Sequence, residues 1–163
     1  MLNEYAVVMI PELGHLALVL ALLFATLQCL IPLIGSFKEN SQLLRSAKPF
    51  ALSQAFWVVV AFGCLEWAFF RNDFSVAYVA ANSNSHLPLF YQLTAIWSAH
   101  EGSLLLWVAI LALWTALVAV WSKRLPLAMQ SRVLAVMGGI SVGFLWFLLQ
   151  LSNPFKRLLM NTP

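Results

Sequence analysis

The stretch LGHLALVLALLFATLQCLIPLI, residues 13–34, runs for 22 positions without a charged residue. A helix needs about 20 consecutive apolar residues to cross the hydrocarbon of a bilayer. A secretory signal would need a basic segment ahead of a shorter apolar core, but only Glu4 and Glu12 are charged before this run. The stretch therefore predicts a transmembrane helix, with Pro32 acting as a breaker near its end.

The rest of the chain has the same character. It is 62% hydrophobic and 9% charged, whereas a soluble domain has about 25% charged residues. Further apolar runs cover residues 50–70, 102–121 and 133–151. We predict an all-α integral membrane protein, with about four transmembrane helices in a lipid bilayer.

Lysine and arginine predict the orientation, because they concentrate in cytoplasmic connections. Six lie between spans one and two or between spans three and four, namely Lys38, Arg45, Lys48, Lys123, Arg124 and Arg132. Three lie elsewhere, namely Arg71, Lys156 and Arg157. We expect both termini, and the connection between spans two and three, on the outer (in bacteria, periplasmic) face. Because these charges flank spans instead of covering one soluble face, no nucleic-acid partner is expected.

The predicted outer connection covers residues 71–102. Its segment DFSVAYVA alternates weakly, which suits either an extended segment or one in the membrane interface, and NSNS is a turn sequence. Pro88 suits the start of a helix. Residues 89–97 then form either the protruding start of the third span or a separate interfacial helix. His15, His86 and His100 all fall on this outer side.

The third span begins with the sequence AHEG, which contains His100 and Glu101. At the membrane boundary this pair avoids the cost of about 2.5–3.5 kcal/mol for a charge at the bilayer centre. His100, Trp107, Trp114 and Trp121 are seven residues apart and share one stripe of the helix. The stripe either packs against helices and lipid or, with Trp97 nearby, lines the approach to a planar hydrophobic ligand.

Other residues predict packing. Gly139 and Gly143 form a G-x-x-x-G pattern that permits close helix approach. Glu66, near the outer end of the second span, is expected to reach the interface or to pair within the bundle. Cys29 and Cys64 fall at opposite depths, so no disulfide is expected.

Three motifs resemble one family. PELGH at residues 11–15, DFSVAYVAANSNSHLPLFYQLTAIWSAHEGSLLLW at 73–107 and SNPFKRL at 152–158 are similar to the N-terminal part of the CcmF/NrfE family. These are cytochrome c-type biogenesis proteins, subunits of the bacterial haem lyase. One departure is Gln92, where a lysine is common.

The resemblance implies a multi-pass protein of the inner membrane that receives haem at the periplasmic face. It implies attachment of that haem to the CxxCH cysteines of apocytochrome c, through thioether bonds to reduced thiols. A haem chaperone and other cytochrome c maturation subunits are the implied partners. Our own hypothesis is that AHEGS then braces the outer mouth of the subunit, with Glu101 pairing or hydrogen-bonding near His100.

The family's tryptophan-rich WWD segment and the histidines that hold a b-type haem are expected after SNPF, and no counterpart follows in this sequence. We therefore interpret residues 1–163 as one membrane section: an N-terminal fragment, a split subunit or a truncated reading frame. Haem is not expected to be ligated by this chain alone, and we assign no catalytic or metal-binding residue. The candidates for ligand approach are His100, Glu101, Trp97, Trp107 and His15.

Two other functions remain open. A transporter fragment should carry charges at mid-membrane depth, and Glu66 alone meets that requirement poorly. An interaction module would dock other membrane subunits without touching haem.

Overall fold

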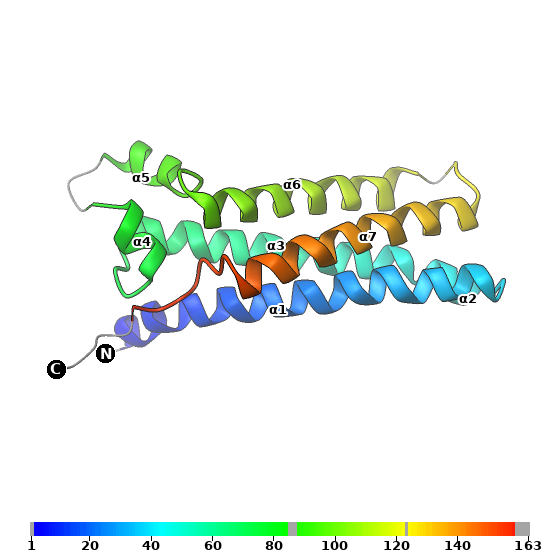
Figure 1. Ribbon diagram of the computed structural model, residues 1–163, viewed down its shortest axis with the longest axis horizontal. Helices are drawn as coiled ribbons and strands as arrows, with labels where there is room; N and C mark the ends of the chain where they lie inside the picture. Colours follow the sequence, from blue (N-terminus) through cyan, green and yellow to red (C-terminus); the bar gives the residue numbers. More distant parts are fainter. Residues whose placement is uncertain (1, 85–87, 123, 159–163) are drawn as a thin grey trace.

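The computed structural model describes residues 2–84, 88–122 and 124–158. Within these ranges four long helices form a bundle and three short helices lie at its two ends (Figure 1). The helices are α1 (Leu2–Phe37), α2 (Ser41–Arg45), α3 (Ala47–Phe70), α4 (Ala77–Asn82), α5 (Leu89–Ala95), α6 (His100–Trp121) and α7 (Leu127–Gln150).

The prediction of about four transmembrane helices is confirmed. The described segments long and apolar enough to cross a membrane are Met9–Phe37, Ser41–Phe70, His100–Trp121 and Leu127–Gln150. The first is longer than the predicted 13–34, because α1 continues through Pro32 to Phe37. The expectation that Pro32 ends the helix is therefore wrong. Its ring is buried, and a proline in a membrane helix is tolerated where neighbouring packing compensates for the missing backbone donor.

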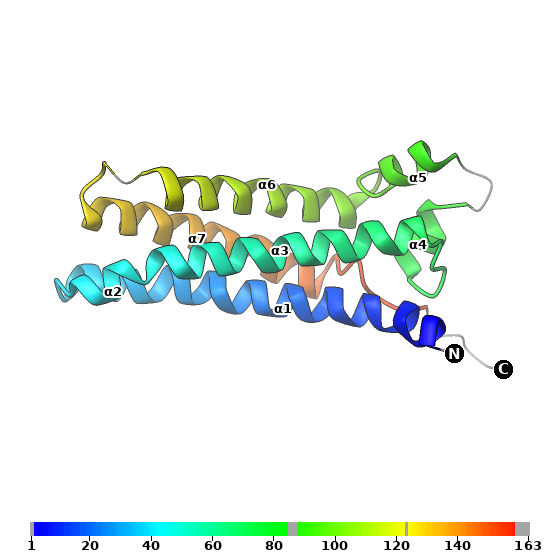
Figure 2. The same ribbon diagram turned by 180° about the vertical axis from the view of Figure 1, so that it is seen from behind.

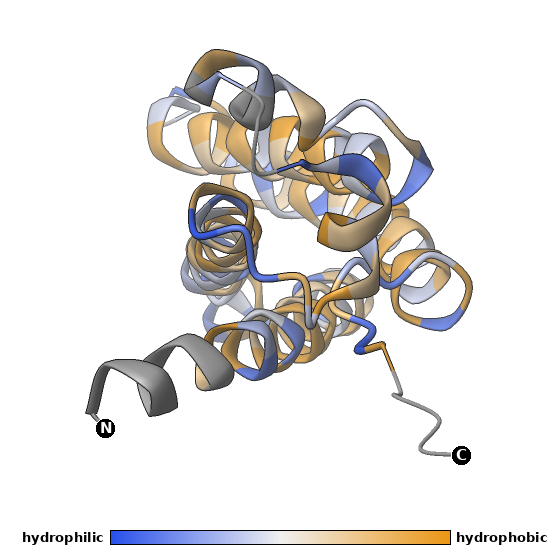
Figure 3. Ribbon diagram, turned by 90° about the vertical axis from the view of Figure 1, so that its left-hand side faces the viewer, coloured by the Kyte–Doolittle hydropathy of each residue, from blue (hydrophilic) through white to orange (hydrophobic). Residues whose placement is uncertain are grey.

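The bundle places α1 and α6 on opposite sides, with α3 and α7 between them (Figure 1). Small side chains allow the close packing: Ala17, Ala21 and Ala25 of α1 are fully buried. Large apolar side chains, by contrast, are exposed on all four long helices, as contact with lipid or further protein would require. Figure 3 shows hydrophobic positions along the ribbons of the bundle.

α7 packs closely against α1 at Gly138. A Cβ added there would lie 3.1 Å from the carbonyl oxygen of Ala25 and from the amide nitrogen of Cys29. Of the predicted pair, Gly139 also lies against α1, because an added Cβ would be 3.3 Å from Cys29 Sγ, whereas nothing lies within 4 Å of a Cβ on Gly143. The G-x-x-x-G pattern therefore contacts α1 at one of its two glycines.

The connection from α3 to α6 folds into short helices at one end of the bundle. The segment DFSVAYVA leads into α4, and α5 is separate from α6, with a turn at residues 96–99 between them. Of the two alternatives for residues 89–97, the separate helix is confirmed. His86 lies outside the described residues.

Two ends of the bundle can now be defined (Figure 2). The motif end comprises residues 11–15, 71–84, 88–102 and 152–158, where α4 and α5 lie. The basic end comprises residues 35–48, 121–122 and 124–132, which include α2, the end of α6 and the start of α7. Five described lysines and arginines belong to the basic end: Lys38, Arg45, Lys48, Arg124 and Arg132.

Candidate functional site

The first and last motifs of the sequence meet at the motif end. Gly14 of PELGH faces the ring of Phe155 so closely that an added Cβ would lie 2.3 Å from it. Phe155 itself is buried. Glycine is therefore required at position 14 by the space available, since any side chain would displace the ring.

His15 is held by the same segment. The backbone N–H of Phe155 donates to Asn153 Oδ1 at 3.0 Å, so the amide group of Asn153 faces His15 with its nitrogen, and Nδ2 lies 2.9 Å from His15 Nδ1. Because that amide nitrogen can only donate, Nδ1 of the ring accepts and the ring proton sits on Nε2. His15 is thus an oriented, exposed side chain.

Arg157 joins the segment after α7 to two other parts of the chain. Its Nε donates to Glu12 Oε1 at 2.9 Å, and its Nη1 donates to Ser75 Oγ at 2.8 Å. The backbone adds two bonds, from Ala77 N to Lys156 O and from Leu158 N to Ser75 O, both 2.9 Å. Residues 152–158 therefore form a strap across the N-terminal part of α1 and the start of α4.

The corner between α5 and α6 is built around Tyr78 and Gly102. The Tyr78 hydroxyl donates to the Ile96 carbonyl oxygen at 2.7 Å, and its ring packs edge-on against Phe69 at 5.5 Å. A Cβ on Gly102 would lie 1.7 Å from the Ile96 carbonyl oxygen and 2.5 Å from the Tyr78 hydroxyl. Position 102 in AHEG therefore needs glycine, because the Ile96 carbonyl oxygen and the Tyr78 hydroxyl oxygen occupy the space that a side chain would take.

Burial raises the pKa of Tyr78, and the negative charge of Glu101 raises it further. Hydrogen bonds from the backbone N–H groups of Gly102 and Ala99 act in the opposite direction. The hydroxyl group is thus kept neutral as a donor to Ile96, with Glu101 beside it.

His100 and Glu101 face different surroundings. Glu101 is half-buried near Tyr78, whereas His100 is exposed, with its ring centroid 6.0 Å from that of Phe147 on α7. His100 also lies at an apolar surface cavity of about 410 Å³ between α6 and α7. The cavity is lined by His100, Leu104, Gly143, Phe144 and Phe147.

The tryptophan stripe does not pack within the bundle. The exposed fractions of Trp107, Trp114 and Trp121 are 66%, 59% and 74%. Trp97, just before α6, is also exposed. The stripe is therefore available to lipid or to another protein.

The five candidate residues do not converge on one point. His100, Trp97 and Trp107 belong to the start of α6 and the turn before it, whereas His15 lies on α1, across the bundle (Figure 1). No group of three or more His, Cys, Asp or Glu side chains suited to a metal ion occurs in the described ranges.

Sequence reasoning missed Tyr78, Asn153 and Phe155. Tyr78 lies in a segment whose alternation suggested extended structure, although its place in a family motif marked it. The sequence marked Asn153 and Phe155 only as part of the motif SNPFKRL. Their contacts could not be predicted, because their partners are more than 130 residues away. Glu66, expected to snorkel or pair, is exposed on α3 beside Trp67 and Phe70.

Known proteins similar to this chain share one description. It is 58% identical over 155 residues to "Cytochrome c-type biogenesis protein CcmF" of Pseudomonas aeruginosa, and 49% identical to the protein of that name in Escherichia coli; each match covers 95% of this chain and 24% of the relative. It is 39% identical to "Cytochrome c-type biogenesis protein NrfE" of Haemophilus influenzae, over 92% of this chain and 24% of that protein. No protein-family model matches the chain.

A solved structure, "Cytochrome c Heme Lyase CcmF", superimposes with a TM-score of 0.86 and 36% identity, over 93% of this chain and 25% of that one. These matches confirm the resemblance predicted from the three motifs. The chain thus corresponds to about a quarter of the length of the cytochrome c-type biogenesis proteins of the CcmF/NrfE family, to which it is related in sequence and in fold.

Proposed function

We propose that this chain is the N-terminal membrane section of a haem-lyase-type subunit and works in c-type cytochrome biogenesis at the bacterial inner membrane. The observation that carries the proposal is the match to CcmF proteins in both sequence and fold, over more than nine-tenths of the chain. Haem and apocytochrome c are then the substrates, and a haem chaperone and other maturation subunits are the partners.

The reaction in question joins haem to cysteine. The S–H bond of a reduced thiol adds across a haem vinyl group: sulfur bonds to one vinyl carbon, and the other carbon receives the hydrogen. Because the thiol is already reduced, the addition needs no oxidant. It needs the vinyl group and the thiol held in register, and a protein accelerates such a step chiefly by positioning.

The described residues do not fit a haem-iron site of their own. A bis-histidine centre needs one imidazole on each face of the same haem ring, but His15 and His100 lie on helices at opposite sides of the bundle. We therefore assign this chain a positioning role. The strap and the Tyr78 corner fix the motif end, and His100 with its apolar cavity faces the space where a planar hydrophobic substrate would approach.

This role requires the motif end on the periplasmic face. The distribution of basic residues supports that orientation, because five described lysines and arginines are at the basic end and three are at the motif end. Ser83→Cys and Ser122→Cys, each in a background without Cys29 and Cys64, test it in intact cells. An impermeant thiol reagent should label position 83 and spare position 122, and the reverse pattern would overturn the orientation.

A second candidate function is an interaction module that docks other membrane subunits and has no haem role. The exposed tryptophans of α6 favour it, since tryptophan is enriched at interfaces. The two functions are compatible if docking is how the section positions the substrate.

The test is deletion of the coding sequence followed by its return on a plasmid. We expect haem-stained c-type cytochromes to disappear and then to recover, while apocytochrome c remains detectable with an antibody. The b-type haem content of the same membranes serves as the control. Normal haem staining in the deletion strain would contradict the proposed function.

A further inference from the structure

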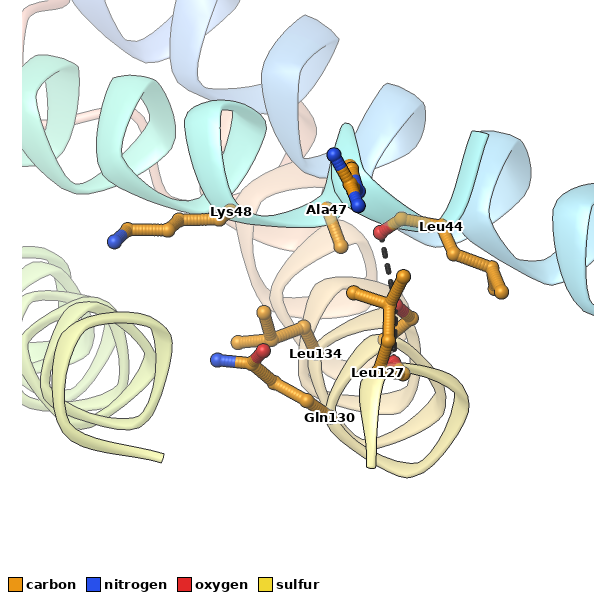
Figure 4. Close-up of a pocket in the computed structure, with 8 residues that line it drawn as sticks. Leu44, Ala47, Lys48, Leu127, Gln130 and Leu134 are labelled. Atoms are coloured by element: carbon orange, nitrogen blue, oxygen red, sulfur yellow. Dashed lines mark hydrogen bonds between the residues drawn. The ribbon is translucent and has the colours of Figure 1, made fainter. Parts of the chain in front are cut away.

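The basic end carries a cavity that the proposed function does not use. It has a volume of about 230 Å³ and lies between the start of α3 and the start of α7 (Figure 4). Its lining residues are Leu44, Arg45, Ala47, Lys48, Leu127, Gln130, Ser131 and Leu134. This is smaller than the roughly 300–1,000 Å³ typical of pockets that enclose a whole small molecule.

The side of the cavity formed by α7 is its floor, and the polar side chains there, Ser131 and Gln130, form hydrogen bonds within the protein. The Ser131 hydroxyl lies 2.8 Å from the Leu44 carbonyl oxygen and 2.7 Å from the Leu127 carbonyl oxygen, and these two acceptors share its one proton. The Gln130 side-chain nitrogen donates to Ser122 Oγ at 2.7 Å and lies 3.3 Å from the Ala119 carbonyl oxygen. These bonds hold α7 against the two neighbouring segments, so the floor is fixed, and its remaining surface is mostly aliphatic.

The two basic side chains that line the cavity, Arg45 and Lys48, have no such partners among the described residues. Arg45 and Lys48 are exposed, neither has an ion-pair partner among the described residues, and no acidic side chain lines the cavity. Figure 4 shows Lys48 and Gln130 extending in the same direction, with Leu134 between them. The cavity thus combines two unpaired positive charges at its rim with an apolar floor.

We propose that this cavity binds the headgroup of an anionic phospholipid, with its phosphate at Arg45 and Lys48 and the start of an acyl chain on Leu127 and Leu134. Basic pockets between transmembrane helices are suited to such headgroups. A free phosphate ion would use the cations but leave the apolar floor empty, so the lipid fits the lining better. Bound there, the lipid bridges α3 and α7.

The experiment uses the whole chain in detergent micelles and native mass spectrometry. Phosphatidylglycerol, phosphatidylcholine and inorganic phosphate are titrated separately, and inorganic phosphate is also added as a competitor. We expect one phosphatidylglycerol molecule to bind at least tenfold more tightly than phosphatidylcholine. Inorganic phosphate at millimolar concentration should not displace it.

Charge removal tests the location. Each of Arg45→Gln and Lys48→Gln should weaken phosphatidylglycerol binding about fivefold, and the double variant about 30-fold. Lys38→Gln with Arg124→Gln removes the same charge from the same end but outside the cavity, and should change binding less than twofold. Circular dichroism is the control that measures whether each variant keeps its helix content. Equal loss in both double variants, or displacement by inorganic phosphate, would overturn the proposal.

Discussion

The two ends of the bundle are built by different means. At the motif end, segments far apart in sequence are locked by glycines with no spare space and by the Arg157, Asn153 and Tyr78 hydrogen bonds. At the basic end, one glycine, Gly35, is also tightly packed, because an added Cβ would lie 2.6 Å from Leu43 Cβ, but a cavity lies between the helices beside exposed cations. The first end therefore has two tightly packed glycines and several bonds between distant segments, whereas the second combines local packing with exposed lysines and arginines.

This difference predicts where substitutions will be tolerated. A residue at the motif end has partners in other segments, so changing it should disturb several elements together. A residue at the basic end is usually exposed, and exposed substitutions generally alter stability by less than about 0.5 kcal/mol. The first three predictions measure how tightly the motif end is locked.

Gly102→Ala should have the largest effect. The new Cβ would lie 1.7 Å from the backbone oxygen of Ile96, which cannot move without shifting the turn before α6. We expect a loss of about 3 kcal/mol in the free energy of unfolding, at the upper end of the range for overpacking. Thermal unfolding in detergent, followed by circular dichroism, is the measurement.

Gly63→Ala is the matched control, because nothing lies within 4 Å of its added Cβ. It should leave stability unchanged or raise it by up to about 1 kcal/mol, as glycine-to-alanine changes within helices do. An equal change in the free energy of unfolding for Gly102→Ala and Gly63→Ala would contradict the distinction between tightly packed and open glycine positions.

Gly14→Ala should cost about 2 kcal/mol, less than Gly102→Ala, because the obstacle is the Phe155 ring instead of backbone. The cost should nearly vanish in a Phe155→Ala background, since the ring that creates the clash is gone. A double-mutant cycle on the unfolding free energy measures this coupling. Additive changes in the unfolding free energy for Gly14→Ala and Phe155→Ala would show that the Phe155 ring does not pack against Gly14.

Tyr78→Phe should lower stability by about 1 kcal/mol, because the Ile96 carbonyl oxygen loses its buried donor. Since the pKa of Tyr78 is raised in the folded state, the native protein holds this proton more tightly than the unfolded chain does. The wild type should therefore lose stability as pH rises above about 10, the unfolded tyrosine value. Unfolding curves at pH 8 to 11 should show a steeper loss for the wild type than for Tyr78→Phe. Parallel curves would rule out this linkage.

Sequence alone predicted the spans well and the contacts poorly. Apolar runs report membrane helices directly, because the bilayer sets their length. The expectation for Pro32 was wrong, and of Gly139 and Gly143 only Gly139 lies against α1. Local rules state which conformation or contact a residue allows, whereas the packing of the neighbouring helix determines which one occurs. The role of Gly102 depends on Tyr78, 24 positions earlier, and no spacing rule connects them.

The candidate site was predicted only in part. The three family motifs come together at one end of the molecule, and because adjacent residues on a helix point about 100° apart, His100 and Glu101 face different surroundings. The separation of His15 from His100 could not be read from the sequence, because both were expected on the outer side. Depth in the membrane follows from position along the chain, but the lateral order of helices follows from packing.

The central claim is that the motif end is where this chain takes part in cytochrome c biogenesis. Its most direct test is the yield of haem-stained c-type cytochrome per unit of this protein, in cells whose only copy carries His100→Ala, Glu101→Gln, or Lys38→Gln with Arg124→Gln. We predict a severalfold lower yield for each of the first two variants at normal protein level, and an unchanged yield for the basic-end control. Normal yield in both His100→Ala and Glu101→Gln would contradict the claim and reduce AHEG to a packing motif.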